Sequence, residues 1–440
     1  MSGVAVVVAE NKLDCSHLLG KFLDESHYDV LVEQDMDFYA PGPFDDGPSE
    51  ENVIFKFRKN AFTQEEQDAA YQGLIGAAQI TNNRGIAAGP KGAAENQRNW
   101  VTEYQESVLE ILIGGSIGLD GTDFLLKMME SKDKFDPEES RGRVWKRSEI
   151  GVEKGDYSDK FFDEWCQSLI PLGQEERRRI ATQYAKVGIS GTSYANPVHS
   201  GVAGFLGRYP RYPYGRSCSY NFHHPEKYET AFPYVRKLDK LFSELLPERY
   251  AYQKACAESL DPAFRVGGDT VFTTLTVNKS FRTAAHFDAG DLHQGFSNLN
   301  VFSGKGDFTG GYLVLPEYRV AVNIRPGDLL LINNHFGLHG NTEIKPAVEG
   351  EPFERMSLVA YFREDLLEVG SWEYETARRD FVEQRRTNPE HPEWRQGWNG
   401  VSPNMFSSKE WVEFLEKTNQ THFLDKYHPE LKKQANTALF

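Results

Sequence analysis

The chain has 440 residues and a net charge of −16, from 49 Lys and Arg against 65 Asp and Glu. Aromatic residues make up 13% of the chain, enough to build a sizeable core, which excludes global disorder. The acidic balance argues at first against a nucleic acid as the partner.

No run of 18 apolar residues occurs, so we expect neither a transmembrane helix nor a membrane partner. The apolar run Val4–Ala9 is too short for a signal peptide and lacks a basic segment before it. The four cysteines are widely spaced with no Cys-x-x-Cys, which is typical of reduced thiols. We therefore expect an intracellular monomer, nuclear or in the cytoplasm or nucleoid.

The first 52 residues form an acidic segment. Between Asp24 and Glu51 there are ten acidic residues and no Lys or Arg, with Pro-Gly turns among them. This pattern predicts an acidic N-terminal loop, with a solvated tether as the preferred interpretation and DNA mimicry as a weak alternative. A strand is predicted at 53–57, and Thr63 with Glu66 predicts a capped helix that runs through Ala78.

The middle of the chain reverses the charge. A loop of small residues is expected at 81–90 and a charged surface insertion at 115–165. Residues 171–260 then carry a net charge of +5. Within them, the segment Gly207–Arg216 alternates arginines with aromatic and turn-forming residues, which suits contact with phosphates and bases. A surface loop stiffened by prolines is an equal alternative. A helix is predicted at 233–246.

Short strands with Gly, Pro and Asp turns follow between residues 270 and 362. They are expected at 271–277, 312–316, 320–324, 329–332 and 356–361. This spacing predicts a β-sandwich or barrel within an α+β fold. The tryptophan-rich residues 366–440 are expected to form a C-terminal helical layer packed on the sheet.

A possible metal site follows the first of these strands. In His286-Phe287-Asp288, residues two apart point the same way in an extended chain, so both side chains can face one metal. His339 is a candidate third ligand, and the spacing alone leaves His335 open. Two histidines and one carboxylate are typical of non-haem Fe(II) oxygenases, with open positions for a 2-oxo acid and oxygen.

An anion-binding pair precedes the last predicted strand. Arg355 and Ser357 lie two residues apart, so a guanidinium and a hydroxyl can hold a carboxylate from one strand face. The alternative is a surface arginine paired with Glu354. Together with the His-x-Asp motif, Gly310-Gly311 and His339, these residues indicate an oxygenase site.

These residues resemble the TET/JBP family of 2-oxoglutarate- and Fe(II)-dependent nucleobase dioxygenases, in particular its base J-binding-protein branch with phage, fungal and algal relatives. The resembling segments are 276–291, 295–299, 310–318, 325–328, 339–342 and 355–357. The segment His339-Gly340-Asn341-Thr342 fits the family pattern and favours His339 over His335. A weaker likeness covers most of residues 53–365, which we take as the dioxygenase domain.

The resemblance implies a double-stranded β-helix (jelly-roll) core with flanking helices. It implies that His286, Asp288 and His339 bind Fe(II) and that Arg355, with Ser357, binds the distal carboxylate of 2-oxoglutarate. It also implies oxidation of the 5-methyl group of 5-methylcytosine or thymine, on a flipped or single-stranded DNA base, with succinate as co-product. The remaining candidate contacts are Asn298 for the co-substrate, Asn278 and Asp291 for the base edge, and Arg84, Arg208, Arg211 and Arg216 for the backbone.

Several alternatives remain open. An algal relative of this family uses ascorbate and transfers a glyceryl group, and the segment from His286 to Asp291 is compatible with both branches. A protein hydroxylase on the same scaffold, a non-catalytic reader of modified DNA, and an enzyme acting on a free nucleotide are the others. The basic residues 171–260 show that the charge of −16 does not exclude DNA, because they can engage it locally.

Overall fold

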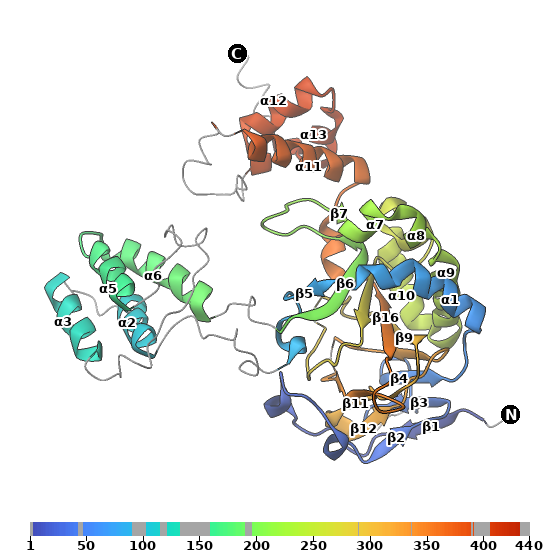
Figure 1. Ribbon diagram of the computed structural model, residues 1–440. Coiled ribbons are helices and arrows are strands. Elements are labelled where there is room, and N and C mark those ends of the chain that lie inside the picture. Colours follow the sequence, from blue (N-terminus) through green and yellow to red (C-terminus); the bar gives the residue numbers. More distant parts are fainter. Residues whose placement is uncertain are drawn as a thin grey trace. The chain divides into compact units, whose positions relative to one another are not determined.

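The computed structural model describes residues 3–42, 47–89, 103–114, 121–132, 159–189, 196–288, 290–335, 337–388, 390 and 405–431. The chain divides into two compact units, shown in Figure 1. One comprises Met1–Pro90 with Pro197–Phe440, and the other comprises Lys91–Asn196. No helix within the described ranges has both the length and the apolar character needed to cross a membrane.

A large mixed sheet is the framework of the first unit. Its described strands, in spatial order, are β1 (Ala5–Val8), β3 (Met36–Tyr39), β4 (Val53–Arg58), β13 (Leu329–Ile332), β9 (Ser297–Lys305), β16 (Glu354–Tyr361), β8 (Thr274–Lys279), β6 (Val198–Leu206) and β5 (Ile80–Thr81), with β7 (Arg216–Ser217) paired to β6. The strands β9, β16 and β8 are antiparallel neighbours at its centre.

A second, smaller sheet packs against one face of the first. Its strands are β14 (Gly340–Asn341), β11 (Leu313–Leu315), β12 (Val320–Val322) and β2 (Val30–Val32), and β10 (Phe308–Gly310) pairs separately with β15 (Ile344–Pro346). One apolar core joins Phe55 and Leu330 of the large sheet to Leu313 and Val322 of the small one. The predicted α+β class with a double-stranded β-helix core is confirmed.

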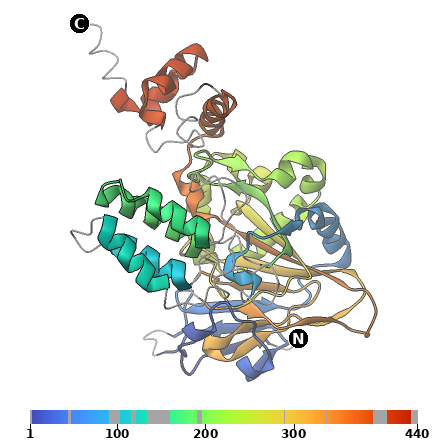
Figure 2. The same ribbon diagram turned by 60° about the vertical axis from the view of Figure 1, so that its left-hand side comes forward.

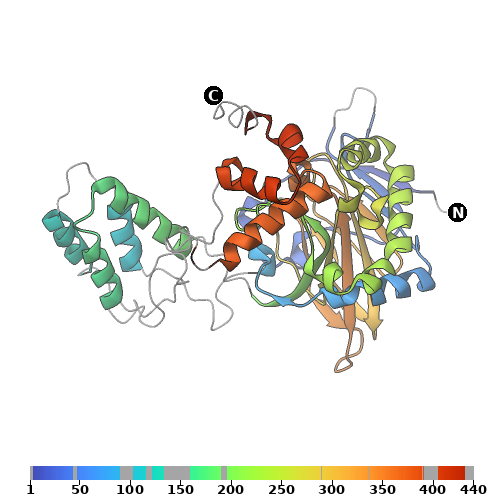
Figure 3. The ribbon, with the colours of Figure 1, turned by 90° about the horizontal axis from the view of Figure 1, so that it is seen from above.

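Helices cover the opposite face of the large sheet. They are α1 (Gln64–Leu74), α9 (Phe232–Leu245) and α10 (Pro247–Glu258), drawn blue to yellow-green beside the sheet in Figure 3. Because side chains alternate along a strand, Met356, Leu358 and Ala360 of β16 pack into this helical layer. Their neighbours in β16 therefore point the other way, between the two sheets, where the site lies.

Most predicted elements of this unit are confirmed. The capping box is present: Glu66 N donates to Thr63 Oγ1 at 3.3 Å, and Thr63 N donates to Glu66 Oε2 at 2.8 Å. The predicted strands at 53–57, 329–332 and 356–361 are β4, β13 and β16, and the helix at 233–246 is α9. The strand expected at 271–277 begins three residues later, as β8.

The expectation of an acidic N-terminal loop was wrong. Residues of this segment form β2 and β3, and β3 pairs with β4 in the large sheet. The acidic charge is compensated locally, because Asp37 accepts ion pairs from Lys56 at 3.1 Å and Arg58 at 2.7 Å. Charge run alone therefore misled the prediction.

The two longest strands, β6 and β9, were not predicted. The sequence of β9 carries Asn298 and Asn300 at positions that are fully buried. Asn300 Nδ2 donates to the carbonyl of Asp328 at 2.8 Å, so burial of this polar side chain is compensated by a tertiary contact. Such a contact is invisible in a hydrophobicity pattern.

The second unit, Lys91–Asn196, is helical and has its own core. Its described helices are α2 (Glu103–Gly114), α3 (Gly121–Lys132), α5 (Asp159–Ser168) and α6 (Gln174–Ile189), cyan to green in Figure 2. Tyr104, Val108, Phe124 and Phe162 are buried together between them. The insertion predicted at 115–165 falls within this unit, and its residues 115–120 and 133–158 lie outside the described residues.

The C-terminal helices do not form a layer on the sheet as predicted. The helices α11 (Trp372–Thr387), α12 (Lys409–Lys417) and α13 (His422–Tyr427) pack around Phe381 and Trp411, with Tyr214 joining the same core. The prediction failed because helical tryptophans indicate a buried face without saying what covers it. Here the partners are the other helices and the segment before β7.

Gly201 in β6 is a position where a methyl group is not tolerated. A Cβ atom there would lie 1.8 Å from the carbonyl oxygen of Ala77, a backbone atom that cannot move freely. We expect Gly201→Ala to destabilise the protein by about 2–3 kcal/mol or more, measured by urea unfolding. Gly173→Ala is the control, since no atom lies within 4 Å of its Cβ position. Equal shifts for the two variants would contradict this explanation.

Candidate active site

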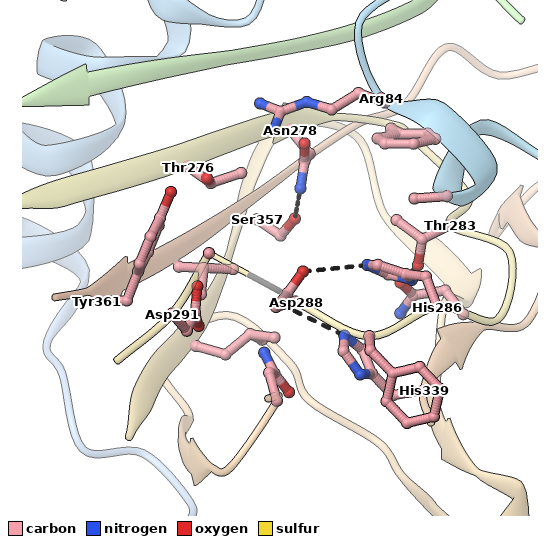
Figure 4. Close-up of a pocket in the computed structure, with 18 of the residues that line it drawn as sticks. Arg84, Thr276, Asn278, Thr283, His286, Asp288, Asp291, His339, Ser357 and Tyr361 are labelled. Carbon is pink, nitrogen blue, oxygen red and sulfur yellow. Dashed lines mark hydrogen bonds and ion pairs between the residues drawn. The ribbon is translucent and has the colours of Figure 1, made fainter. Parts of the chain in front are cut away.

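A cavity of about 370 Å³ opens between the two sheets. Of the twelve predicted site residues, eight line it. They are His286, Asp288 and His339, then Arg355 and Ser357, and then Asn278, Asp291 and Arg84 (Figure 4). The cavity therefore brings the predicted metal, co-substrate and base-edge residues into one space.

Backbone pairing brings the two histidines together. His286 N donates to His339 O at 2.9 Å, and His339 N donates to His286 O at 3.1 Å, across an isolated antiparallel bridge. The Nε2 atoms of His286 and His339 lie 3.4 Å and 3.6 Å from the two carboxylate oxygens of Asp288. Figure 4 shows both rings turned toward Asp288.

The ring orientation of both histidines suits metal binding. His286 Nδ1 lies 2.8 Å from Ala284 O and His339 Nδ1 lies 2.9 Å from Gly337 O. A carbonyl oxygen only accepts, so each Nδ1 carries the proton and each Nε2 lone pair points toward Asp288. Ligand atoms of His286, Asp288 and His339 all lie within 4.8 Å of one another, and no other such group occurs among the described residues. The geometry favours His339 over His335 and fits a 2-His-1-carboxylate iron site.

The charges of the three residues are coupled. Burial opposes ionisation of Asp288, but hydrogen bonds from both histidines hold the pKa of its carboxyl well below the usual 3.8. Burial likewise opposes protonation of His286, yet Asp288 raises its pKa above 6.5. In the metal-free protein, an ionised Asp288 therefore faces at least one protonated imidazole in mild acid.

Metal binding is accordingly expected to weaken as the pH falls. Stability from His286 is present below pH 6.5 and is lost as the pH rises through its raised pKa, whereas stability from Asp288 is present above pH 3.8 and is lost as the pH falls through its lowered pKa. The metal-free protein thus keeps its stability at pH 5.5, while a metal must displace the imidazole protons there. We expect the Tm increase caused by Mn(II) to shrink between pH 7.5 and 5.5, with little change in the metal-free Tm. A constant Tm increase would contradict this view.

Arg355 is a buried cation without an anionic partner. Its side chain is 2% exposed, its Nη2 donates to Gly311 O at 3.4 Å, and its Nε has no hydrogen-bond acceptor. No carboxylate among the described residues forms an ion pair with it. Burial, and secondly the charge of Arg325, lower its pKa to about 10. A buried charge left unpaired is unfavourable, so the site is built for an anion.

The residues beside Arg355 complete this anion site. Ser357 lies on the same face of β16, and Asn278 Nδ2 donates to its Oγ at 3.4 Å. The other end of the Asn278 amide accepts from Ser200 Oγ. The hydroxyl and amide thus extend the polar surface from Arg355 toward the metal triad.

On the other side of Asp288 from the histidines lie Asp291 and Tyr361 (Figure 4). Asp291 is buried, Ser297 Oγ donates to its carboxylate, and burial together with the charge of Asp288 raises its pKa well above the usual value. Burial raises the pKa of the Tyr361 phenol to about 12, so it stays protonated. Arg363 pairs with Asp291 through a backbone bridge and also lines the cavity.

Tyr361 and Arg363 were missed in the sequence. The signal that could have found them is the two-residue period of β16, which starts at Arg355 and Ser357 and continues through Val359. All five of these residues line the cavity.

Four predicted residues do not line the cavity. Asn298 lies in β9 opposite Ala360, a residue of the helix-facing core, while its neighbour Leu299 faces the cavity. The alternation of the strand thus turns the Asn298 amide away from the co-substrate site. Arg208 pairs with the buried carboxylate of Glu375, and Arg211 and Arg216 also lie outside the cavity. Arg84, in contrast, reaches it and donates from Nη2 to Gly201 O at 3.0 Å.

Comparison with known proteins agrees with this geometry. Residues 208–364 match the TET/JBP profile, described as the oxygenase domain of the 2OGFeDO superfamily. The chain is 33% identical over 176 residues to thymine dioxygenase JBP1 of Leishmania braziliensis, covering 39% of this chain and 21% of that protein. It is 31% identical over 210 residues to thymine dioxygenase JBP1 of Trypanosoma brucei brucei, covering 47% of this chain and 24% of that protein.

Among solved structures, NgTET1 in complex with 5mC DNA matches with a TM-score of 0.39 and 10% identity, over 86% of this chain and 91% of that one. The matched part spans about a quarter or less of the length of the JBP1 relatives. The oxygenase domain of this chain belongs to the TET/JBP family of 2-oxoglutarate- and Fe(II)-dependent dioxygenases.

Proposed function

We propose that the protein oxidises the 5-methyl group of a pyrimidine in DNA, with Fe(II) held by His286, Asp288 and His339 and with 2-oxoglutarate as co-substrate. The observation that carries the proposal is the unpaired, buried Arg355 in the same cavity as the three ligand side chains. The JBP1 relatives are named thymine dioxygenases, which makes thymine the first base to test.

The residues fit the iron and the co-substrate. Both Nε2 lone pairs and the Asp288 carboxylate converge, so they can occupy one face of an iron ion and leave three positions open. Bound iron would couple the oxidative decarboxylation of 2-oxoglutarate to the insertion of one oxygen atom into a C–H bond of the substrate. Arg355 and Ser357 would hold the distal carboxylate of 2-oxoglutarate by charge-assisted hydrogen bonds.

The opposite side of the cavity suits a pyrimidine. The protonated phenol of Tyr361 and the guanidinium of Arg363 offer hydrogen-bond donors to base carbonyl oxygens, and the Asp291 carboxyl can accept from an N–H group. Asn278 lies between this side and the co-substrate site. A base can reach these groups only after it leaves the duplex stack, and Arg84 would then hold the backbone beside the cavity.

Apolar side chains complete the cavity. Leu299, Leu313 and Val359 line it from β9, β11 and β16. They limit the water that can reach the space beside the metal ligands, which favours oxidation of the bound methyl group over side reactions.

The test is mass spectrometry of nucleosides after incubation of thymine or 5-methylcytosine duplexes with Fe(II) and 2-oxoglutarate. We expect a hydroxymethyl pyrimidine and an equal amount of succinate, both absent without 2-oxoglutarate. A three-carbon adduct that requires ascorbate would select the glyceryl-transferring alternative instead. Turnover of 2-oxoglutarate that a peptide stimulates, with no oxidised base, would select a protein hydroxylase.

A further inference from the structure

An arginine cluster lies at the turn of the segment Gly207–Arg216. Tyr209 N donates to Tyr212 O at 2.9 Å and Tyr212 N donates to Tyr209 O at 2.7 Å, so the four residues 209–212 form a tight turn. The guanidinium carbons of Arg211, Arg216 and Arg386 lie 6.0, 4.7 and 5.0 Å from the centre of the Tyr212 ring. Arg386 comes from α11, far away in the sequence, and donates to the carbonyl of Arg211.

Positive charge exceeds negative charge in this cluster. Glu383 pairs with Arg386 at 2.8 Å and also accepts from the hydroxyl of Tyr214 at 3.2 Å. Neither Arg211 nor Arg216 forms an ion pair with a carboxylate of the described residues. Three guanidinium groups therefore share one carboxylate around a single ring. Like charges held this close repel one another, and an anion placed among them relieves that repulsion.

The other arginines of the region show the contrast. Arg208 donates from Nε to Glu375 at 3.2 Å and also from Nη2, and Glu375 is almost fully buried. Arg379 pairs with Asp380 at 2.8 Å on the exposed side of α11. These charges are compensated within the protein. The predicted group of backbone-binding arginines thus divides into a structural Arg208 and the uncompensated Arg211 and Arg216, to which α11 adds Arg386.

The segment is anchored at both ends. Gly207 N donates to Asp365 at 3.2 Å, and Gly215 N donates to Glu375 at 2.7 Å. The same Asp365 carboxylate accepts from Nε of Arg363, at 3.0 and 3.1 Å, and Arg363 lines the cavity. One carboxylate therefore connects the start of the segment to the cavity wall. The turn itself stays open to solvent, with Tyr209 62% exposed and Arg211 exposed.

We propose that Arg211, Arg216 and Arg386, ordered around Tyr212, bind backbone phosphates of the DNA whose base enters the cavity. The inference rests on the proposed function and names the surface through which the substrate is held. Guanidinium groups bind phosphate by paired hydrogen bonds, and the anchored segment and the ring restrict them before DNA arrives. In a chain with a net charge of −16, such a local excess of positive charge favours a polyanion over a neutral partner.

The experiment measures binding of a 30-base-pair duplex by fluorescence anisotropy at several salt concentrations, and Fe(II)- and 2-oxoglutarate-dependent turnover on the same duplex. For the triple variant Arg211→Gln, Arg216→Gln and Arg386→Gln, we expect Kd and the KM for DNA to rise about tenfold or more. We expect the slope of log K against log salt to fall by about one for each lost phosphate contact. The KM for 2-oxoglutarate should not change.

Two further variants separate phosphate binding from a structural role. Arg379→Gln, on the same helix, is the matched control and should keep the wild-type Kd and salt slope. Arg211→Gln alone removes an exposed side chain, so it tests the cluster even where the triple variant fails to fold. Arg386→Lys retains the charge and should retain most of the salt slope.

A wild-type Kd and salt slope in Arg211→Gln would overturn the proposal, as would an equal loss in Arg379→Gln. Absence of duplex binding by the wild-type protein would also overturn it. Binding with the expected slopes but without any oxidised base would instead support the cluster and contradict the proposed reaction. The two failures are therefore distinguishable.

Discussion

Replacing His339 by alanine is expected to abolish metal binding and all turnover, whereas His335→Ala should keep both. His339 supplies one of the two Nε2 atoms that face Asp288, and its Nδ1 is already bonded to Gly337 O at 2.9 Å. Losing a residue that merely orients a metal ligand weakens metal affinity by about 10–100-fold, so loss of a ligand should exceed that range. Mn(II) titration by electron paramagnetic resonance measures the affinity directly.

His335→Ala is the matched control because it removes a histidine only four residues away, and it was the alternative ligand by spacing. Circular dichroism of both variants shows whether the fold is retained. Equal loss of Mn(II) affinity in the two variants would contradict the assignment of His339. Tight Mn(II) binding by His339→Ala would contradict it more directly.

Replacing Arg355 by methionine is expected to remove the response to 2-oxoglutarate without destabilising the protein. The wild-type guanidinium is buried with no carboxylate partner among the described residues, so its removal takes away an unfavourable buried charge. Methionine fills a similar volume. We expect an unchanged or higher Tm in the absence of 2-oxoglutarate, and a KM for 2-oxoglutarate raised by about 100-fold or more, as for loss of a buried charge pair worth about 3 kcal/mol or more.

Thermal shift measurements separate the two effects. At a concentration of about 100 Kd, 2-oxoglutarate should stabilise the wild-type protein by about 2.7 kcal/mol, and this stabilisation should vanish in the variant. Arg325→Met is a useful control, because Arg325 also lies over the Phe308 ring but donates to the carbonyls of Phe308 and Gly310. A large loss of Tm for Arg355→Met without 2-oxoglutarate, with an unchanged response to it, would show that the residue is structural.

The local signals in the sequence were reliable where the chemistry is local. The His286-Phe287-Asp288 motif and the Arg355–Ser357 pair each lie on a short extended segment, and in such a segment residues two apart share a face whatever surrounds them. The capping box of α1 depends in the same way on only four residues. These features were predictable because their geometry is set by the backbone conformation alone.

Three misjudged features depend on contacts between distant segments. The acidic residues before β4 looked like a loop, yet Asp37 pairs with Lys56 and Arg58 of a neighbouring strand. The buried Asn300 of β9 looked polar because its acceptor, Asp328 O, lies 28 residues further along the chain. Arg208 looked like a substrate contact because Glu375, its partner, belongs to α11. Charge and hydrophobicity patterns along the chain contain no record of such partners.

The sequence by itself determined the class of chemistry, because side-chain type and two-residue spacing decide which groups can face one metal ion and one carboxylate. Only the tertiary structure decided which histidine joins the motif, through the backbone bridge between His286 and His339. It also decided that Tyr361 and Arg363 enter the cavity while Asn298 does not. The reason is physical: strand pairing and burial select among side chains that are chemically equivalent in the sequence, and those selections are made by residues far away along the chain.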